Sequence, residues 1–284
     1  MKSVRFHIAV VVCVLVAVVS SGQSSRRNKK PPVEPTARIT SSASATKNSS
    51  FTAAAANNAS LRNELSWSFG GKQQRGWYLY DLLIGETLKS DADPLTDDFA
   101  AKLASWQKKR GLNAVGVLDE GALMALVSQW QSVRLKNRTA ATPDQLITAP
   151  PSDFYDPGRA AELRQVERKT YEAYKVMLAA AMADPELKVR GNYLKIVSSF
   201  RSPEYQEQLR QKSPNAGRAG LAVNSPHFTG RALDLYVGGD PVDTKDANRA
   251  IQVKTPAYRW LVRNAERFGF RPYFYEPWHW EYVK

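Results

Sequence analysis

The chain has 284 residues, 43% of them hydrophobic, which is enough for one large domain or two smaller ones with buried cores. Its only cysteine, Cys13, and one of its three histidines, His7, lie in the first 22 residues. If that segment is removed, disulfides, thiolate zinc sites, iron–sulfur clusters and a cysteine nucleophile are excluded. Imidazole chemistry must then come from His227 and His279.

The N-terminus has the pattern of a signal peptide. Lys2 and Arg5 form a short basic head, and an unbroken apolar run of twelve residues extends from Ile8 to Val19. A membrane-spanning helix needs roughly 20 apolar residues, so the run is short for an anchor. We expect residues 1–22 to be a signal peptide, with an uncleaved N-terminal anchor as the alternative. Either way, the rest of the chain is expected to be exported, to the periplasm or the cell wall.

Residues 23–60 are rich in Ser, Ala, Thr, Asn and Pro, and they include the run Ala53–Ala56. Because such a segment buries too little apolar surface to offset the loss of chain entropy, we expect a disordered linker. Six basic residues and one acidic residue make it cationic, in a chain of net charge +13. It could contact acidic wall polymers or a membrane surface, or act only as a solvated spacer. The chain shows no basic, aromatic-laced groove motif, so we expect no nucleic-acid partner.

Residues 61–138 are expected to form a small all-α bundle. Thr96 is placed to cap a helix that ends at Gly111, and Asp119 is placed to cap the next helix. In that second helix, apolar residues repeat at helical spacing: Ala122, Leu126, Trp130 and Val133. The stretch Phe99–Leu126 resembles the small three-helix peptidoglycan-binding domains of wall enzymes. The resemblance implies wall binding, and a purely structural helical module is the alternative.

Residues 139–157 contain several prolines and are expected to be the linker between two domains. A long helix is predicted to follow and to reach about Ala183, with Leu163 and Val166 on its buried stripe. Residues 158–284 would then form the second domain.

Strands and helices alternate in the rest of this second domain. Three segments are candidate strands: Leu194–Phe200, Arg231–Val237 and Trp278–Val283. Ser202 with Pro203, and Thr255 with Pro256, mark the starts of two helices. This interleaving predicts an α+β domain.

Both remaining histidines lie in short segments rich in polar residues. His227 precedes the strand that carries Asp234, and Asp234 lies on the face opposite Leu233 and Leu235. A buried carboxylate needs a counter-charge, which a divalent metal supplies. Two imidazoles and one carboxylate, with a fourth position left to water, form the ligand set of a catalytic zinc. Glu276 lies three residues before His279 and would be the general base, because Pro277 bends the chain between them.

These motifs resemble those of the LAS-type zinc peptidases, which include the D-alanyl-D-alanine carboxypeptidases of the VanY-like family. Three motifs carry the resemblance: Ser198–Gln206, Ser225–Asp234 and Glu276–His279. It implies a small antiparallel sheet flanked by helices, one zinc ion, and peptidoglycan stem peptides as substrates. His227, Asp234 and His279 would bind zinc, and Glu276 would activate water.

The same resemblance implies that Arg201 stabilises the oxyanion, with Ser225 and Gln206 near the substrate. A planar guanidinium also suits carboxylates, so Arg201 could instead bind a peptide C-terminus. Glu281 and Phe200 depart from the family pattern, which leaves the fine choice of substrate open.

The predicted function is hydrolysis of the terminal D-alanyl-D-alanine bond. The alternatives are an L,D-carboxypeptidase or an endopeptidase that acts on the same polymer, or a non-catalytic wall-binding protein with a structural zinc. Manganese or cobalt could occupy the same ligands.

Overall fold

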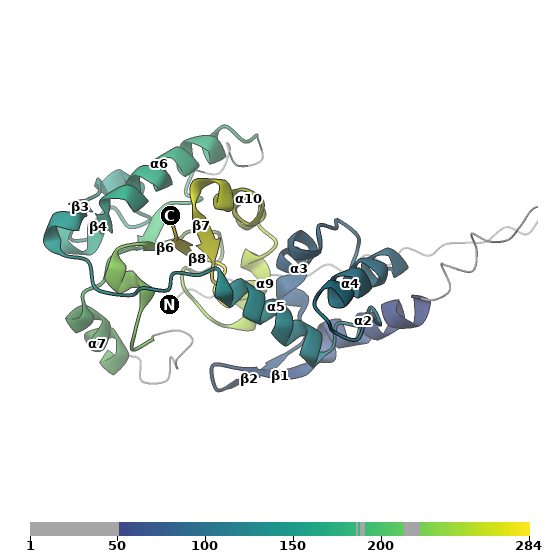
Figure 1. Ribbon diagram of the computed structural model, residues 1–284. Helices are drawn as coiled ribbons and strands as arrows, with labels where there is room; N and C mark the ends of the chain where they lie inside the picture. Colours follow the sequence, from purple (N-terminus) through teal and green to yellow (C-terminus); the bar gives the residue numbers. More distant parts are fainter. Residues whose placement is uncertain (1–50, 186, 188–190, 213–221) are drawn as a thin grey trace, which may run out of the picture. The chain divides into compact units, whose positions relative to one another are not determined.

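The computed structural model describes residues 51–185, 187, 191–212 and 222–284, and all of them belong to one compact unit (Figure 1). The predicted signal peptide and most of the predicted basic linker lie outside these residues. Within the described part of the chain, no helix is both long enough and apolar enough to cross a membrane.

The prediction of a disordered linker is wrong for residues 51–60, which form the start of helix α2 (Thr52–Glu64). Alanine has the highest helix propensity, and two alanines of this helix are buried. The buried Asn58 amide donates to the Gly116 carbonyl (2.9 Å) and accepts from the Leu118 N–H (2.8 Å). The helix is therefore held by the turn that connects two later helices.

The rest of this region contains three further helices and a β-hairpin. The helices are α3 (Asp81–Leu88), α4 (Asp97–Lys109) and α5 (Glu120–Ser132), and the short 3-10 turn η1 (Tyr78–Tyr80) precedes α3. Strands β1 (Ser66–Phe69) and β2 (Lys72–Arg75) pair antiparallel. The sequence analysis missed this hairpin, because its short strands are mostly polar and follow no helical or apolar pattern.

The predicted caps of α4 and α5 are confirmed. The Thr96 side chain accepts from the Phe99 N–H (3.4 Å), and the Asp119 side chain accepts from the Ala122 N–H (2.8 Å). Val133 was expected on the buried stripe of α5, but the helix ends at Ser132 and Val133 is exposed.

The predicted proline-rich linker is a folded segment. It contains the 3-10 turns η2 (Pro143–Gln145) and η3 (Pro151–Asp153) and the strand β3 (Leu146–Thr148). Strand β3 pairs antiparallel with β4 (Gln165–Glu167), which follows the turn η4 (Ala161–Arg164).

The predicted long helix is shorter than expected, since α6 spans only Arg168–Met182. Leu163 lies in η4, and Val166 is buried in β4. The Glu167 carboxylate caps α6 by accepting from the Thr170 N–H (2.7 Å). The chain before Glu167 extends instead to pair with β3.

The second half of the chain is built on a four-stranded sheet in the order β5-β6-β8-β7, with every neighbouring pair antiparallel. The strands are β5 (Ile196–Ser198), β6 (Ala232–Leu235), β7 (Phe270–Pro272) and β8 (His279–Tyr282). Besides α6, the described residues of this half form the helices and 3-10 turns α7 (Pro203–Lys212), η5 (Pro226–Thr229), α9 (Asp246–Gln252), α10 (Pro256–Asn264) and η6 (Ala265–Phe268).

Helices α6 and α10 pack with the sheet in one hydrophobic core, which includes Tyr174, Leu233 and Leu261 (Figure 1). The predicted α+β class is confirmed.

The tip of the β7–β8 hairpin is buried in a second core, which the helices α3–α5 form with the β1–β2 hairpin. The Phe274 ring lies 4.7 Å from Phe69, 5.4 Å from Tyr80 and 5.8 Å from Trp130, measured between centroids. The two predicted domains therefore share hydrophobic packing. Their boundary and the wall-binding role of residues 61–138 stay predictions.

Replacing Phe274 by Ala should lower the free energy of unfolding by about 3–5 kcal/mol, because it removes a large buried ring from this core. Urea unfolding monitored by circular dichroism measures the change. Val176→Ala, at a side chain 61% exposed on α6, is the control and should stay within about 0.5 kcal/mol. Equal losses for the two variants would contradict the role of Phe274.

Candidate metal centre

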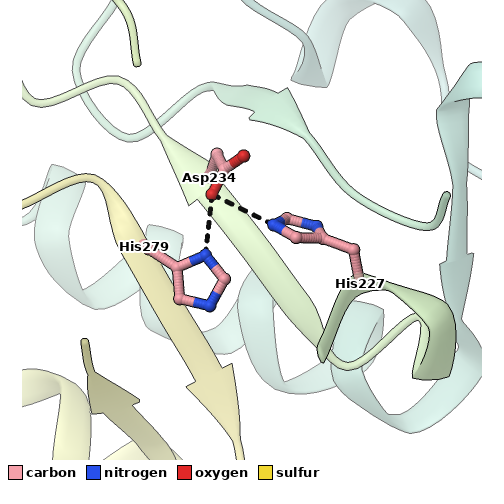
Figure 2. A group of neighbouring side chains, drawn as sticks. All are labelled: His227, Asp234 and His279. Atoms are coloured by element: carbon pink, nitrogen blue, oxygen red, sulfur yellow. Dashed lines mark hydrogen bonds and ion pairs between the residues drawn. The ribbon is translucent and has the colours of Figure 1, made fainter. Parts of the chain in front are cut away.

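The three predicted metal ligands meet at a cavity of about 470 Å³. One donor atom from each of His227, Asp234 and His279 lies within 4.8 Å of the others, and all three residues are buried. Figure 2 shows both imidazole rings directed at the Asp234 carboxylate. The structure thus brings together residues that are up to 52 positions apart in the sequence.

Local backbone structure places His227 at the start of the turn η5. The Ser225 side chain caps this turn by accepting from the His227 N–H (3.3 Å), and Gly230 ends it with a φ of +64°. A Cβ atom at Gly230 would lie 2.9 Å from the Glu167 nitrogen. Both the backbone conformation and the close approach therefore require glycine in this motif.

Strand register places Asp234 beside His279. Asp234 on β6 lies directly opposite His279 on β8, so their side chains project from the same face of the sheet. The Asp234 Oδ1 atom lies 3.0 Å from His279 Nδ1 and 3.2 Å from His227 Nε2.

Two consecutive turns bring Glu276 to the same place. The Glu276 N–H donates to the Tyr273 carbonyl (3.0 Å), and the His279 N–H donates to the Glu276 carbonyl (2.9 Å). Pro277 lies within the second turn, as the predicted bend requires. The Glu276 carboxylate is buried and lies 3.9 Å from His279 Nδ1.

Hydrogen bonds on the far side of each ring fix which nitrogen faces the cluster. His227 Nδ1 lies 2.7 Å from the Ser199 carbonyl, which can only accept, so this nitrogen carries the proton and Nε2 is free to bind a cation. His279 Nε2 lies 3.2 Å from Glu281 Oε1, which leaves Nδ1 facing Asp234. Such outer partners orient metal-binding histidines.

Glu281 connects the metal-ligand cluster to the segment that follows α5. Its buried carboxylate accepts from Arg134 Nε (3.1 Å) and forms an ion pair with the same guanidinium, and it also accepts from the Leu135 N–H (2.9 Å). The Arg134 guanidinium lies 3.9 Å from the centroid of the Tyr273 ring. This acidic residue, unexpected in the sequence, is therefore fully paired.

Arg201 reaches the cluster from the loop after β5. Its Nη2 atom donates to Asp234 Oδ2 (2.6 Å) and its Nε atom donates to Ser198 Oγ (2.9 Å). The contact with Gln206 Oε1 is longer, at 3.4 Å. Arg201 and Ser225 line the cavity, whereas the buried Gln206 lies behind Arg201 and donates to the Ala222 carbonyl (3.1 Å).

The electrostatics favour anionic Asp234 and neutral His227. Burial opposes ionisation of Asp234, but the neighbouring His227, Arg201 and His279 outweigh it and hold the pKa of this carboxyl well below its usual range. Burial, together with the charge of Arg201, lowers the pKa of His227 to about 4. A neutral imidazole beside an ionised carboxylate is the state in which both bind a metal.

The remaining groups show that the cluster attracts positive charge. Burial opposes protonation of His279, but the hydrogen bonds to Asp234 and Glu281 dominate and raise its pKa to about 9. Burial also opposes ionisation of Glu281, yet His279 and Arg134 lower its pKa to about 2. Burial raises the pKa of Glu276 to about 8.

Two of the three donor-to-donor distances fit a tetrahedral zinc ion. Zinc–nitrogen and zinc–oxygen bonds of about 2.0–2.2 Å separate tetrahedral ligand atoms by about 3.4 Å. The two distances from Asp234 Oδ1 to the imidazole nitrogens, 3.2 Å and 3.0 Å, are close to this value. Both of these nitrogens face the carboxylate, and all three donor atoms lie within 4.8 Å of one another.

Sequence reasoning missed the outer partners of the ligands. Glu281 could have been found, because it lies two residues after His279 and so on the same face of the strand. The Ser199 carbonyl carries no side-chain signal. Arg134 lies 147 positions before Glu281, and no local pattern connects them.

Comparison with known proteins identifies the class. Residues 163–284 match the family model of VanY, D-alanyl-D-alanine carboxypeptidase. The matched segment contains His227, Asp234, Glu276 and His279, in agreement with the resemblance of its motifs. The match supports hydrolysis of peptidoglycan peptides, and it does not include the helices before it.

Solved structures also match. The LD-carboxypeptidase LdcB, whose structure is described as revealing the molecular basis of peptidoglycan recognition, is 25% identical; the match covers 50% of this chain and 70% of that chain, with a TM-score of 0.37. A variant of the vancomycin-resistance D,D-pentapeptidase VanY from a VanB-type cassette, in complex with Zn(II), is 22% identical, with coverage of 42% and 74% and a TM-score of 0.30. No curated protein matches the chain.

Replacing Glu281 by Gln should weaken zinc binding by about 10- to 100-fold, because the charge that orients His279 is lost and Arg134 is left unpaired. Competition with a chromophoric chelator measures the dissociation constant. Glu266→Gln, which removes a surface partner of Arg271, is the matched control. Unchanged zinc affinity in the Glu281 variant would refute this orienting role.

Proposed function

We propose that the chain is a zinc metallopeptidase that hydrolyses the terminal D-alanyl-D-alanine bond of peptidoglycan stem peptides. The observation that carries the proposal is the convergence of three metal-binding atoms and a buried carboxylate on one cavity of a VanY-family domain. A substrate in the wall requires an exported protein, in keeping with the predicted signal peptide.

His227 Nε2, Asp234 Oδ1 and His279 Nδ1 would hold one zinc ion. When bound, zinc supplies a Lewis acid that lowers the pKa of water to about 7, and a positive charge that favours ionised Glu276. The protein's own contribution is to hold three ligands on rigid elements: a capped turn and two paired strands.

Glu276 would take the proton from the attacking water and later pass it to the leaving amine. Its position supports this role, because it lines the cavity and its carboxylate lies 3.9 Å from a ligand atom. Its burial keeps bulk water from competing for the proton. A purely structural metal site would not need such a base.

Arg201 would stabilise the charge that develops on the carbonyl oxygen of the scissile bond. The hydrogen bonds to Ser198 and Asp234 fix its orientation before substrate arrives. Ser225 would contact the substrate at the cavity wall, and Gln206 would support Arg201 from behind.

Replacing Glu276 by Gln should lower kcat by at least about 100-fold while zinc remains bound, because the substitution removes the base and no metal ligand. Steady-state kinetics on a D-Ala-D-Ala peptide measures the rate, and elemental analysis of the purified variant measures the zinc content. A variant with full zinc and near wild-type kcat would refute the role of Glu276.

Mass spectrometry of purified muropeptides incubated with the protein identifies the bond. We expect pentapeptide stems to lose one alanine, with the activity abolished by a chelator and restored by zinc. Loss of alanine from tetrapeptides alone would instead indicate an L,D-carboxypeptidase, and release of larger fragments an endopeptidase. The absence of any cleavage would favour a wall-binding protein.

A further inference from the structure

We propose that Arg138 and Arg159 form two separate anion-binding positions in the cavity, so that the preferred substrate carries a carboxylate on each side of the scissile bond. One carboxylate is the peptide's C-terminus, and the other belongs to an acidic residue before the scissile dipeptide. The inference rests on the proposed function and defines its substrate class.

Four arginines line the cavity: Arg134, Arg138, Arg159 and Arg201. Two of them already have carboxylate partners, because Arg134 pairs with Glu281 and Arg201 pairs with Asp234. Neither Arg138 nor Arg159 has a carboxylate within ion-pair distance among the described residues. Two half-buried guanidinium groups are thus available for an anion from solution.

Arg138 lies near Arg134, Glu281 and Tyr273. Its Nη1 atom donates to the Asn224 carbonyl (2.8 Å), which fixes the side chain without neutralising it. Burial and the neighbouring Arg134 lower the pKa of the Arg138 guanidinium. An added negative charge at this position would be stabilised by two guanidinium groups.

Arg159 lies near Arg201 and Tyr205. Its Nε atom donates to the Leu163 carbonyl (3.0 Å), and its own carbonyl accepts from Arg164 Nε (3.0 Å). Burial and the nearby charge of Arg201 lower the pKa of the Arg159 guanidinium, and Tyr205, Asp234 and Asp156 only partly offset them. The segment around Arg159 is therefore fixed at the cavity edge.

The chemistry of these groups selects carboxylates. A guanidinium is planar, stays charged at neutral pH and binds carboxylates through paired hydrogen bonds. The two positions have different neighbours, since Arg134 and Tyr273 lie near Arg138, whereas Arg201 and Tyr205 lie near Arg159. Arg138 and Arg159 also precede residues 163–284, so this selectivity is supplied by chain outside the matched family domain.

The test uses four synthetic acyl-X-D-Ala-D-Ala peptides. Residue X is 2-aminoadipate or its side-chain amide, and the C-terminus is a free acid or an amide. We compare kcat/KM for the zinc-loaded full chain and for the variants Arg138→Gln and Arg159→Gln. The control is Arg267→Gln, at an exposed arginine outside the cavity. Circular dichroism and melting temperature establish that each variant is folded.

We expect the wild-type protein and the control to prefer the diacid by about 10- to 100-fold over either peptide that lacks one carboxylate. One of the variants Arg138→Gln and Arg159→Gln should lose only the preference for the C-terminal acid, and the other should lose only the preference for the acidic side chain. Either assignment of the two arginines to the two carboxylates supports the inference. Equal losses on all four peptides, or no loss, would overturn the inference.

If the wild-type protein cleaves all four peptides equally, the proposed function stands and the two-carboxylate inference fails. If it cleaves none, the proposed function fails, and calorimetry of the same four peptides with the zinc-loaded protein decides the inference. Tighter binding of the diacid that Arg138→Gln and Arg159→Gln each reduce would support the two positions, and equal affinities would refute them.

Discussion

The Asp234 carboxylate is buried where His227, His279 and Arg201 all contact it, and most of the site is arranged around this charge. A carboxylate removed from water is costly unless donors surround it. Oδ2 is satisfied by Arg201, while Oδ1 faces the two imidazoles. The two oxygens therefore have different roles. Oδ2 binds Arg201, and Oδ1 faces the position where a cation fits.

The residues of the cluster were predictable from the sequence, whereas the residues that hydrogen-bond to them and orient them were not. His227, Asp234, Glu276 and His279 lie in short motifs whose residue types suit metal-assisted hydrolysis, and the structure brings them together. Arg134 supports the same site from another part of the chain, and only tertiary packing reveals it. The role of Gln206 illustrates the same limit, because its distance to the cavity depends on the turn of α7.

Among the helices and strands, too, local features were predicted and tertiary ones were not. Caps such as Thr96 and Asp119 are local, and they were predicted because the side chain and its N–H partner lie within one turn. The start of α6 was placed too early, because pairing of β4 with β3 is a non-local interaction that overrides helical periodicity. Residues 51–60 were assigned to a linker because their composition hides the buried hydrogen bonds of Asn58.

The turn that joins Glu276 to His279 also determines how the cluster would come apart during local unfolding. The His279 N–H donates to the Glu276 carbonyl, and the Tyr273 N–H donates to the His279 carbonyl, so few backbone hydrogen bonds close the loop that carries both Glu276 and His279. The neighbouring Phe274 fastens this loop into the helical core. Local opening of the hairpin would therefore displace His279 and Glu276 together. Loss of His279 from the ligand cluster and loss of Glu276 from the cavity should then follow one time course.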